Sequence, residues 1–501
     1  SDLKGVNKMI DTNAILLSDT YKQCHRRIYP KGLAKLVSYW TPRRSMFADP
    51  DDEMIFFGLQ GFIKEYLIEY FNKNFFERSA AEVKESYRRY MDIQIGVGNC
   101  DLESVMELHE LGFLPIKLSA LPEGTKVPMG IPCIQLTNTD SRFAWVTQWV
   151  ECLLQASLWK PCCHATVGWK YHKLAEKYYK ETVDDSVSPF DAMADFGMRG
   201  MSCMDEAIHA SVAWLLSFNK TSTIPAIPYI EQMYRTDCLA AGIGRGAVST
   251  EHSCQGANFA VDGDEITFIK RMLTELYPNT SFSMVSDTYD YWNLVNNLLP
   301  QCNKEIMEHN GKMLIRPDSG DIVKISVATV QKLWEIFGGT TNEKGYKVLD
   351  PHIGIIYGDG CQLTTVETIW EQLKELGFAA NCITFGVGAF CFAATIEENG
   401  KMIALTRDTY GIAMKATLGV VEENGAEQRF FIYKDPKTDM SHMKKSHRGY
   451  CNVVESSGKL RCLDCLYYEP KETLLQPVFC DGKLLKDEDF VTIRNRIYGG
   501  E

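Results

Sequence analysis

The sequence lacks several features that would define its class at once. It has no stretch of about 18 uninterrupted apolar residues, so no membrane-spanning helix is expected. Its first residues, SDLKGVNKMIDTN, contain no apolar segment of the kind found in secretory signal peptides. Basic residues are in the minority, with 53 Lys and Arg against 65 Asp and Glu and a formal charge of −12. Because nucleic acids and anionic membranes are bound through positive surface, neither is an expected partner.

Regularly paired cysteines are also missing, although the chain has 17 cysteines. Their irregular spacing and the missing signal segment predict free thiols in a reducing cytoplasm. Cys462 and Cys465 form one close pair between Cys451 and Cys480. Such a group raises the question of a zinc site. The flanking cysteines are single rather than paired, so ordinary thiols are the favoured interpretation.

What the chain does contain is regular apolar patterning. Hydrophobic residues make up 45% of the 501 residues, which is enough for a large core. Residues 58–73 carry them at helical spacing, and residues 143–159 and 165–179 are also predicted to be packed helices. Residues 115–139 are short β-like runs broken by turns. The first part of the chain is therefore expected to mix helices and strands.

From about residue 192 the pattern changes to apolar runs of strand length, each followed by a polar loop and a helical segment. This repeated order predicts an α/β fold with a parallel sheet or barrel. β-type patterning returns from about residue 418. We predict an N-terminal mixed part (1–160), an α/β barrel with the active site (161–416) and a C-terminal β-rich part (417–501). The first and last parts are expected to pack together as one β-rich domain.

Every unusual polar cluster of the middle region follows a predicted strand. These clusters are GMRG, DTYD, RPDSGD, GDG and GVGAF. Active sites of α/β barrels form where such loops converge, at the C-terminal ends of the strands. Helix capping explains some of the polar residues, and Ser202 with Asp205 fits an N-cap pattern. Five clusters in succession nevertheless indicate a site.

The residue types in these loops suit a sugar phosphate and a divalent ion. Asp318 and Asp359 can accept hydrogen bonds from sugar hydroxyls. The glycines of Gly358-Asp-Gly360 and Gly386-Val-Gly388 allow a ligand close to the backbone. Guanidinium groups that suit phosphate are Arg199, Arg316 and Arg407.

Two further positions leave alternatives open. Asp287 and Asp290 can hold Mg²⁺, which needs few protein ligands, or Asp287 can cap the helix that follows. His252 is either an active-site group or a structural histidine.

Taken together, the motifs resemble those of the nicotinamide phosphoribosyltransferase family along nearly the whole chain. The matching stretches include LLSDTYKQCH, VSYWTPR, DFGMRG, VSDTYD, IRPDSG, FGVG, LTRD and YKDP. The resemblance implies a type II phosphoribosyltransferase fold, with an irregular α/β barrel and a β-rich domain built from both chain ends. It also implies a homodimer with shared active sites, a need for Mg²⁺, and in some members coupling to ATP. The implied reaction converts nicotinamide and 5-phosphoribosyl-1-pyrophosphate (PRPP) into nicotinamide mononucleotide and pyrophosphate.

Residue roles follow from the same resemblance. Phe196 and Tyr21 of the partner subunit are expected to enclose the pyridine ring. The catalytic set would be His252, Asp318, Asp287 and Arg316, with His252 at the position phosphorylated in ATP-coupled members. Substrate-binding residues for the ribose and phosphate would be Arg199, Asp318, Gly358, Asp359, Gly388 and Ala389. The pyrophosphate would lie among Arg43, Arg407, Lys415, Lys434 and Lys444, several of them reaching across the dimer.

Departures from the family pattern leave the substrate open. Ser222 stands where the amide-using family carries an aspartate, and a serine removes the repulsion of a carboxylate. Nicotinate is therefore an alternative to nicotinamide. Ala389 replaces a glycine and Ala413 a serine, which bears on phosphate binding and on ATP coupling. A non-catalytic binding module on the same fold is a third interpretation, and the retained Arg316, Asp318 and Asp359 argue against it.

Overall fold

The computed structural model describes residues 12–438 and 446–499. The chain forms two compact units. Unit 1 comprises Ser1–Cys163, Gln232–Thr236 and Thr406–Glu501, and unit 2 comprises His164–Glu231 and Asp237–Leu405. The two ends of the chain thus share one unit. The three-part division 1–160, 161–416 and 417–501 stays a prediction, because a compact unit need not fold independently.

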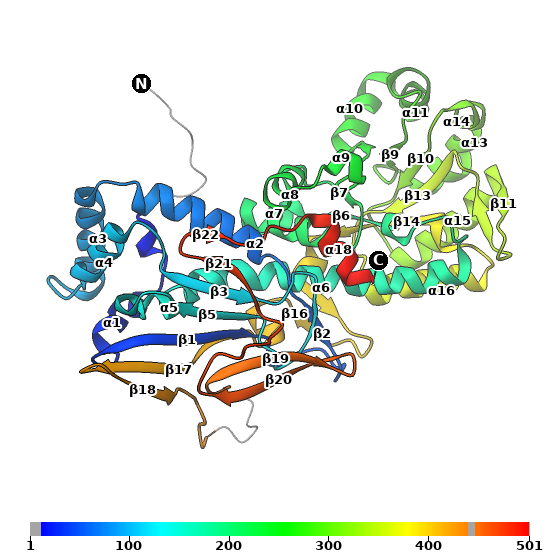
Figure 1. The fold of residues 1–501 in the computed structure, drawn as a ribbon. Helices are drawn as coiled ribbons and strands as arrows, with labels where there is room; N and C mark the ends of the chain where they lie inside the picture. Colours follow the sequence, from blue (N-terminus) through cyan, green and yellow to red (C-terminus); the bar gives the residue numbers. More distant parts are fainter. Residues whose placement is uncertain (1–11, 439–445, 500–501) are drawn as a thin grey trace. The chain divides into compact units, whose positions relative to one another are not determined.

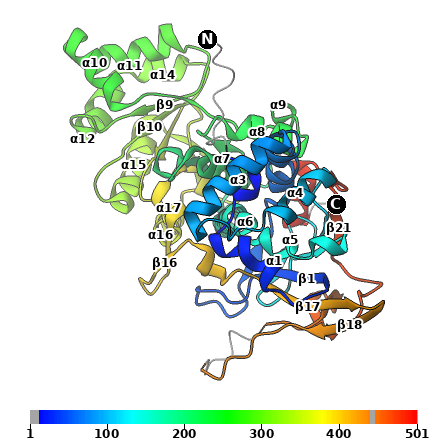
Figure 2. The same cartoon turned by 90° about the vertical axis from the view of Figure 1, so that its left-hand side faces the viewer.

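Unit 1 is built on a seven-stranded sheet with the order β18-β17-β1-β5-β3-β21-β22, in which all pairings are antiparallel. Within this sheet, β1 (Leu33–Thr41) pairs with β17 (Ala413–Glu423) on one side and with the central strand β5 (Ile134–Asn138) on the other. β1 and β17 run side by side in both views (Figure 1 and Figure 2). The other strands are β3 (Ile116–Ala120), β18 (Ala426–Phe431), β21 (Gln476–Cys480) and β22 (Lys483–Leu484).

Two two-stranded sheets and several helices complete unit 1. One pairs β2 (Glu53–Ile55) with β4 (Lys126–Pro128), and the other is the hairpin of β19 (Tyr450–Ser456) and β20 (Lys459–Leu466). The predicted helix at 58–73 is present as α2 (Leu59–Phe62), which continues through two π-helical segments to Phe76. The remaining helices of eight or more residues are α3 (Ala80–Ile95), α4 (Leu102–Leu111) and α18 (Phe490–Tyr498). Their apolar faces join one core with the sheet, including Phe71, Tyr87 and Trp149.

Unit 2 contains the predicted parallel sheet. Its seven strands are ordered β7-β6-β14-β13-β10-β9-β8, and every pairing is parallel. The bounds are β6 (Met193–Phe196), β7 (Lys220–Thr221), β8 (Val248–Ser249), β9 (Phe282–Val285), β10 (Met313–Arg316), β13 (Ile353–Tyr357) and β14 (Ile383–Gly388). An isolated parallel bridge joins Lys220 to Arg245, shortly before β8, so the sheet curls round irregularly. The α/β fold expected from the sequence is confirmed.

Helices follow the strands of unit 2, as in other α/β folds. They include α7 (Met204–Trp214), α10 (His252–Asp262), α15 (Ile322–Phe337), α16 (Leu363–Glu375) and the short α17 (Ala389–Ala393). α15 and α16 lie beside the parallel strands (Figure 1). Asp321 accepts a hydrogen bond from the backbone N–H of Lys324, at 3.1 Å, and so caps α15. The expected cap at Ser202 is wrong by one residue, because Cys203 occupies the N-cap of α7 and its Sγ accepts from the N–H of Glu206.

The two helices expected at 143–159 and 165–179 differ in the structure. A short helix α5 (Val146–Trp149) precedes one long helix, α6 (Glu151–Thr182), which runs through Pro161. The limit between the two units, at Cys163, falls within α6. Within residues 12–438 and 446–499, no helix is both long and apolar enough to cross a membrane.

Candidate active site

Polar side chains gather at the C-terminal ends of the parallel strands in unit 2. Phe196 ends β6, Ser222 follows β7, Arg316 ends β10, and Gly388 ends β14. The other expected residues of this unit lie in the loops or helix starts that come next, namely Arg199, His252, Asp287, Asp318, Gly358, Asp359 and Ala389. The sheet therefore brings together, at one end, the site residues predicted between residues 196 and 389. Arg407 and Lys415, which also fall within the predicted barrel (161–416), lie in unit 1 instead.

Asp195 in β6 organises the part of this edge next to Phe196. Its carboxylate is buried and accepts hydrogen bonds from the Ser211 hydroxyl, from the Thr221 hydroxyl at 2.7 Å and from the N–H of Gly197 at 2.8 Å. Burial raises the pKa of this carboxyl, and the hydrogen bonds act in the opposite direction. Sequence reasoning missed Asp195. The available signal was an acid inside the apolar strand AMADF.

Ser222 is oriented by the backbone of Asp195. Its N–H donates to the Asp195 carbonyl oxygen at 2.9 Å, and its hydroxyl donates to that oxygen at 3.0 Å. The Ser222 side chain is exposed, and it lies beside the residue that precedes Phe196. Because its proton is engaged, the hydroxyl offers lone pairs to a ligand. It can accept a hydrogen bond from an N–H group without losing the one it donates.

Arg316 and Asp318 form the next part of the edge. Arg316 donates to the Ser283 hydroxyl at 3.2 Å and to the Thr250 carbonyl at 2.6 Å, which fixes the guanidinium group. Its Nε lies 3.5 Å from Asp318 Oδ2. Burial raises the pKa of the Asp318 carboxyl and Arg316 lowers it, while Asp287 raises it further. The Arg316 guanidinium thus holds the Asp318 carboxylate in place.

Asp287 supports the loop of Asp318 and does not cap a helix. Its Oδ2 accepts hydrogen bonds from the Asp318 N–H at 3.0 Å and from the Ser319 hydroxyl. The cap of the following helix is Asp290, which accepts from the N–H of Asn293 at 2.9 Å. The alternative interpretation of Asp287 as a cap is therefore wrong. Oδ1 of Asp287 and Oδ1 of Asp318 are buried without a hydrogen-bond partner among the described residues. Two such oxygens suit Mg²⁺, which prefers oxygen ligands and keeps part of its water shell.

His252 lies at the start of α10 with half of its side chain exposed. Its Nδ1 is 3.0 Å from the Thr288 hydroxyl, and its Nε2 is 3.8 Å from Asp287 Oδ1. The histidine is therefore accessible and shares a carboxylate with the loop of Asp318.

Gly358 and Gly388 lie on neighbouring strands of the same edge. A Cβ atom on Gly358 would lie 2.5 Å from Asp318 Oδ1 and 3.3 Å from Arg316 Cδ, so a larger residue there would displace the Asp318 carboxylate. Asp359 Oδ1 comes within 3.8 Å of the position that a Gly388 Cβ would occupy. Asp318 and Asp359 thus lie on loops that follow adjacent strands, as vicinal hydroxyls of one sugar would require.

Unit 1 carries the second group of expected residues. A cavity of about 350 Å³ is lined by Arg43 and Lys415, with Tyr39, Thr41, Gly130, Ala413, Thr417, Ser446, His447 and Asp464. Burial lowers the pKa of Lys415. Glu151 opposes that effect, whereas Arg43 and Lys434 add to it. Burial also lowers the pKa of Arg43, and Arg44 and Arg407 act in the same direction. Cations that repel one another around a hollow are suited to binding a polyanion.

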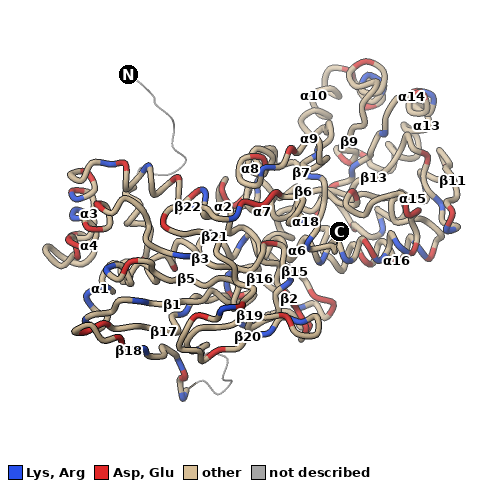
Figure 3. The backbone as a smooth tube through the Cα atoms, viewed as in Figure 1, with Lys and Arg blue, Asp and Glu red and all other residues tan. Residues whose placement is uncertain are grey.

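The remaining expected residues of unit 1 have separate surroundings. Tyr21 lies in the turn Thr20–Cys24, where 54% of it is exposed. Arg407 is exposed beside Asp408, and the backbone N–H of Lys434 donates to the Ser446 hydroxyl at 2.9 Å. Lys444 lies outside the described residues. Across both units, Lys and Arg are interspersed with Asp and Glu (Figure 3).

Unit 2, a curled parallel sheet with carboxylates and arginines at its strand ends, has the architecture of an α/β enzyme that binds a phosphorylated sugar. Comparison with known proteins gives the particular family. The model of the nicotinate phosphoribosyltransferase (NAPRTase) family matches residues 192–482, and that of the nicotinamide phosphoribosyltransferase N-terminal domain matches residues 13–118. The chain belongs to this family of phosphoribosyltransferases.

Curated relatives match over nearly the full length. A nicotinamide phosphoribosyltransferase of Acinetobacter baylyi is 37% identical, over 97% of this chain and 97% of the relative. Another of that description, from Xanthomonas campestris, is 31% identical over 96% of this chain and 97% of its own length. The resemblance seen in the motifs is therefore confirmed.

Solved structures share the fold at low sequence identity. A nicotinate-nucleotide pyrophosphorylase from Pyrococcus furiosus superposes with a TM-score of 0.55 at 14% identity, covering 100% of this chain and 98% of that one. The human nicotinic acid phosphoribosyltransferase gives a TM-score of 0.53 at 13% identity, covering 97% and 93%. At such identities the likeness describes the fold.

Proposed function

We propose that this enzyme joins nicotinamide to PRPP and releases nicotinamide mononucleotide and pyrophosphate, a step of NAD salvage. The observation that carries the proposal is the near full-length match to relatives described as nicotinamide phosphoribosyltransferases, including the N-terminal domain of that enzyme. The roles of individual residues that follow are part of the proposal.

The geometry of Ser222 supports nicotinamide as the base. Its hydroxyl donates to the Asp195 carbonyl, so its lone pairs are free to accept from a carboxamide N–H. A carboxylate has no proton to donate, and nicotinate would gain this contact only if the hydroxyl turned away from Asp195. Nicotinate remains the second candidate, because an uncharged Ser222 does not repel it.

In the proposed mechanism, the protein binds polyanions and orients the base. Asp318, Gly358 and Asp359 hold the ribose hydroxyls, while Arg316 and Arg199 bind polar groups of the substrate. As C1 of the ribose loses pyrophosphate, positive charge develops on the sugar, and the nearby carboxylates stabilise it. The ring nitrogen of nicotinamide, held against Phe196, then forms the new bond to C1. Such positioning is the main catalytic contribution expected here, because no covalent nucleophile is required.

Mg²⁺ and ATP are proposed as further requirements. Oδ1 of Asp287 and Oδ1 of Asp318, which have no hydrogen-bond partner among the described residues, would hold a magnesium ion. When bound, Mg²⁺ would neutralise charge on the leaving pyrophosphate. His252 is exposed enough to accept a phosphoryl group from ATP, and Asp287 lies 3.8 Å from its Nε2. Whether ATP is used stays a prediction.

We also propose a cytoplasmic homodimer in which each active site uses Tyr21 of the partner subunit. The described cysteines include no disulfide, which agrees with a reducing compartment. Shared sites predict complementation. A Tyr21→Ala chain mixed with an Arg316→Ala chain should recover up to about a quarter of the wild-type activity, because random pairing leaves one intact site in half of the dimers. No recovery, with mixed dimers shown by native mass spectrometry, would argue against shared sites. The expectation that neither nucleic acid nor a membrane is a partner stays a prediction.

The main test is an assay with PRPP, Mg²⁺ and each pyridine in turn, with nucleotide products identified by mass spectrometry. We expect nicotinamide mononucleotide from nicotinamide, at a kcat/KM well above that for nicotinate. Product from nicotinate alone would replace the proposal by the second candidate. No product from either base, with and without ATP, would contradict both.

A further inference from the structure

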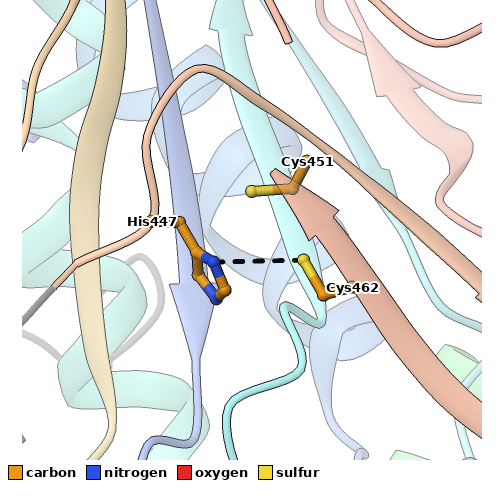
Figure 4. A group of neighbouring side chains, drawn as sticks. All are labelled: His447, Cys451 and Cys462. Carbon is orange, nitrogen blue, oxygen red and sulfur yellow. Dashed lines mark hydrogen bonds between the residues drawn. The ribbon is translucent and has the colours of Figure 1, made fainter. Parts of the chain in front are cut away.

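Three side chains of the types that bind transition metals meet at the β19–β20 hairpin of unit 1. Cys451 lies in β19, Cys462 lies in β20, and His447 lies just before β19. One ligand atom of each, two sulfurs and a ring nitrogen, lies within 4.8 Å of the other two. Figure 4 shows the three side chains pointing toward one another. This set differs from the cysteine pair that stands out in the sequence, because Cys465 is exposed and Cys480 lies in β21.

An irregularity in the hairpin creates this arrangement. Val453 pairs with Cys462, and the register shifts between Tyr450 and Asn452, so that Cys451 faces two residues of β20. One of these two, Cys465, has a left-handed backbone with φ of 66°. The pattern is that of a β-bulge, which redirects side chains locally. Cys451 is buried by it, and Cys462 remains on the inward-facing side of the alternating strand.

The imidazole of His447 is already oriented for metal binding. Its Nε2 lies 3.0 Å from the Gly130 carbonyl oxygen, which can only accept, so Nε2 carries the hydrogen. Nδ1 lies 4.0 Å from Cys462 Sγ and 3.3 Å from Asp464 Oδ2, and this carboxylate, which also only accepts, favours a hydrogen on Nδ1. A metal ion would displace that hydrogen and take the Nδ1 lone pair. A histidine that donates its other N–H to a backbone carbonyl is the usual arrangement of a metal ligand.

We propose that His447, Cys451 and Cys462 bind a Zn²⁺ ion, with Asp464 as the candidate fourth ligand. Zinc–sulfur bonds of about 2.3 Å and zinc–nitrogen bonds of about 2.0 Å place tetrahedral ligand atoms roughly 3.5–3.8 Å apart. The observed 4.0 Å between Nδ1 and Sγ needs to close by only a few tenths of an ångström. On binding, Zn²⁺ replaces the thiol protons of Cys451 and Cys462, which pass to solvent.

The proposed ion would anchor one wall of the cationic cavity. His447 and Asp464 line that cavity together with Arg43 and Lys415. The metal would thereby fix the position of His447 relative to the central strands of the sheet, without taking part in chemistry at the strand ends of unit 2. The site does not depend on the proposed function, and a failure of one leaves the other intact.

The first experiment measures zinc in the full-length chain, purified in reducing buffer and reconstituted with ZnCl₂ before desalting. Plasma mass spectrometry should find about one zinc per chain. Cys462→Ser and His447→Ala should lose at least nine-tenths of it, whereas the exposed Cys465→Ser serves as the matched control and should keep it. Circular dichroism of each variant shows whether its fold is retained.

A second measurement does not depend on variants. Replacement of zinc by Co²⁺ in the wild-type chain should give the near-ultraviolet thiolate-to-cobalt bands and the intense visible bands of a tetrahedral site. Retention of zinc by folded Cys462→Ser, or wild-type chain that binds neither ion after reconstitution, would overturn the proposal. A Cys451–Cys462 disulfide that persists in reducing buffer, detected by peptide mass spectrometry, would overturn it as well.

Discussion

The hydroxyl of Ser222 offers the sharpest test of how this enzyme distinguishes an amide from an acid. It donates to the Asp195 carbonyl at 3.0 Å, and the N–H of the same residue donates to that oxygen at 2.9 Å. Nicotinamide can donate to the hydroxyl as it stands, whereas nicotinate requires the hydroxyl to give up its own hydrogen bond. That hydrogen bond contributes about 1 kcal/mol, which corresponds to about a five-fold preference for the amide.

Two substitutions separate the terms. Ser222→Ala leaves the Asp195 carbonyl with its N–H donor, so the fold should survive and the ratio of kcat/KM for the two bases should fall about five-fold. Ser222→Asp places a carboxylate near the acid of nicotinate. At about 4 Å and an effective dielectric constant of 20, the repulsion is about 4 kcal/mol, so nicotinate turnover should fall more than 100-fold.

Steady-state kinetics with each base at saturating PRPP provides the measurement. Ser249→Ala is a matched control, because Ser249 is also an exposed serine at the end of a strand, and its hydroxyl also donates to a backbone carbonyl. It should leave the ratio unchanged. If Ser222→Ala raised the preference for nicotinamide, or Ser222→Asp used nicotinate as well as the wild type does, the reasoning from the orientation of the hydroxyl would be refuted.

Other predictions concern Asp318, the cationic cavity and the stability of unit 1. Asp318→Asn should lower kcat/KM by on the order of 100-fold, because two charge-assisted hydrogen bonds to the ribose are lost. Since burial raises the pKa of the Asp318 carboxyl, the acidic limb of the wild-type rate profile should lie above pH ~3.9 and should disappear in the variant. Lys415→Met should raise the KM for PRPP about ten-fold without lowering the melting temperature, because repulsion by neighbouring cations is relieved; an unchanged KM would remove Lys415 from the site. Burial raises the pKa of Glu123 to about 7, so the folded chain holds a proton that the unfolded chain releases above pH ~4.3. The stability that this group contributes therefore falls as pH rises to 7. Denaturant titrations at pH 5 and pH 8 should show a smaller loss of stability in Glu123→Gln than in the wild type. Gly58→Ala should destabilise the fold by about 1–3 kcal/mol, because φ is 106° and the new Cβ would lie 2.8 Å from Pro161 Cβ; an unchanged melting temperature would contradict this.

The parallel sheet and its active edge could be predicted because both leave local signals. Strands buried on both faces appear as continuous apolar runs, and the loops that follow them are where a parallel sheet collects its polar residues. Position along the chain was therefore enough to group Arg316, Asp318 and Asp359. Asp287 was harder to interpret, because its carboxylate accepts a hydrogen bond from the Ser319 hydroxyl of a neighbouring loop and does not cap a helix.

Long helices buried on all sides were less predictable. α6 was expected as two helices because amphipathic periodicity disappears in its middle, where residues 158–169 are almost all buried whatever face they occupy. Pro161 in the same stretch adds a further signal for a break, although the helix continues through it.

The group around His447 could not be found from spacing. Metal motifs read from a sequence rely on ligands a few residues apart, and attention falls on Cys462 and Cys465. The actual neighbours are set by the pairing of β19 with β20 and by a bulge that a one-dimensional pattern does not encode.

The pairing of β1 with β17 has a consequence for the order of folding. Thr41 of β1 pairs with Ala413, so more than 370 residues must be synthesised before the two strands can meet. Until then β1 can pair only with β5, and its other edge is an open template for another chain. Unit 2 lies between the two strands in sequence and has no such delay. We therefore expect nascent chains that end before β17 to be the aggregation-prone species during synthesis. Protection of the open edge of β1, by charged residues or a bound chaperone, is needed most at that stage.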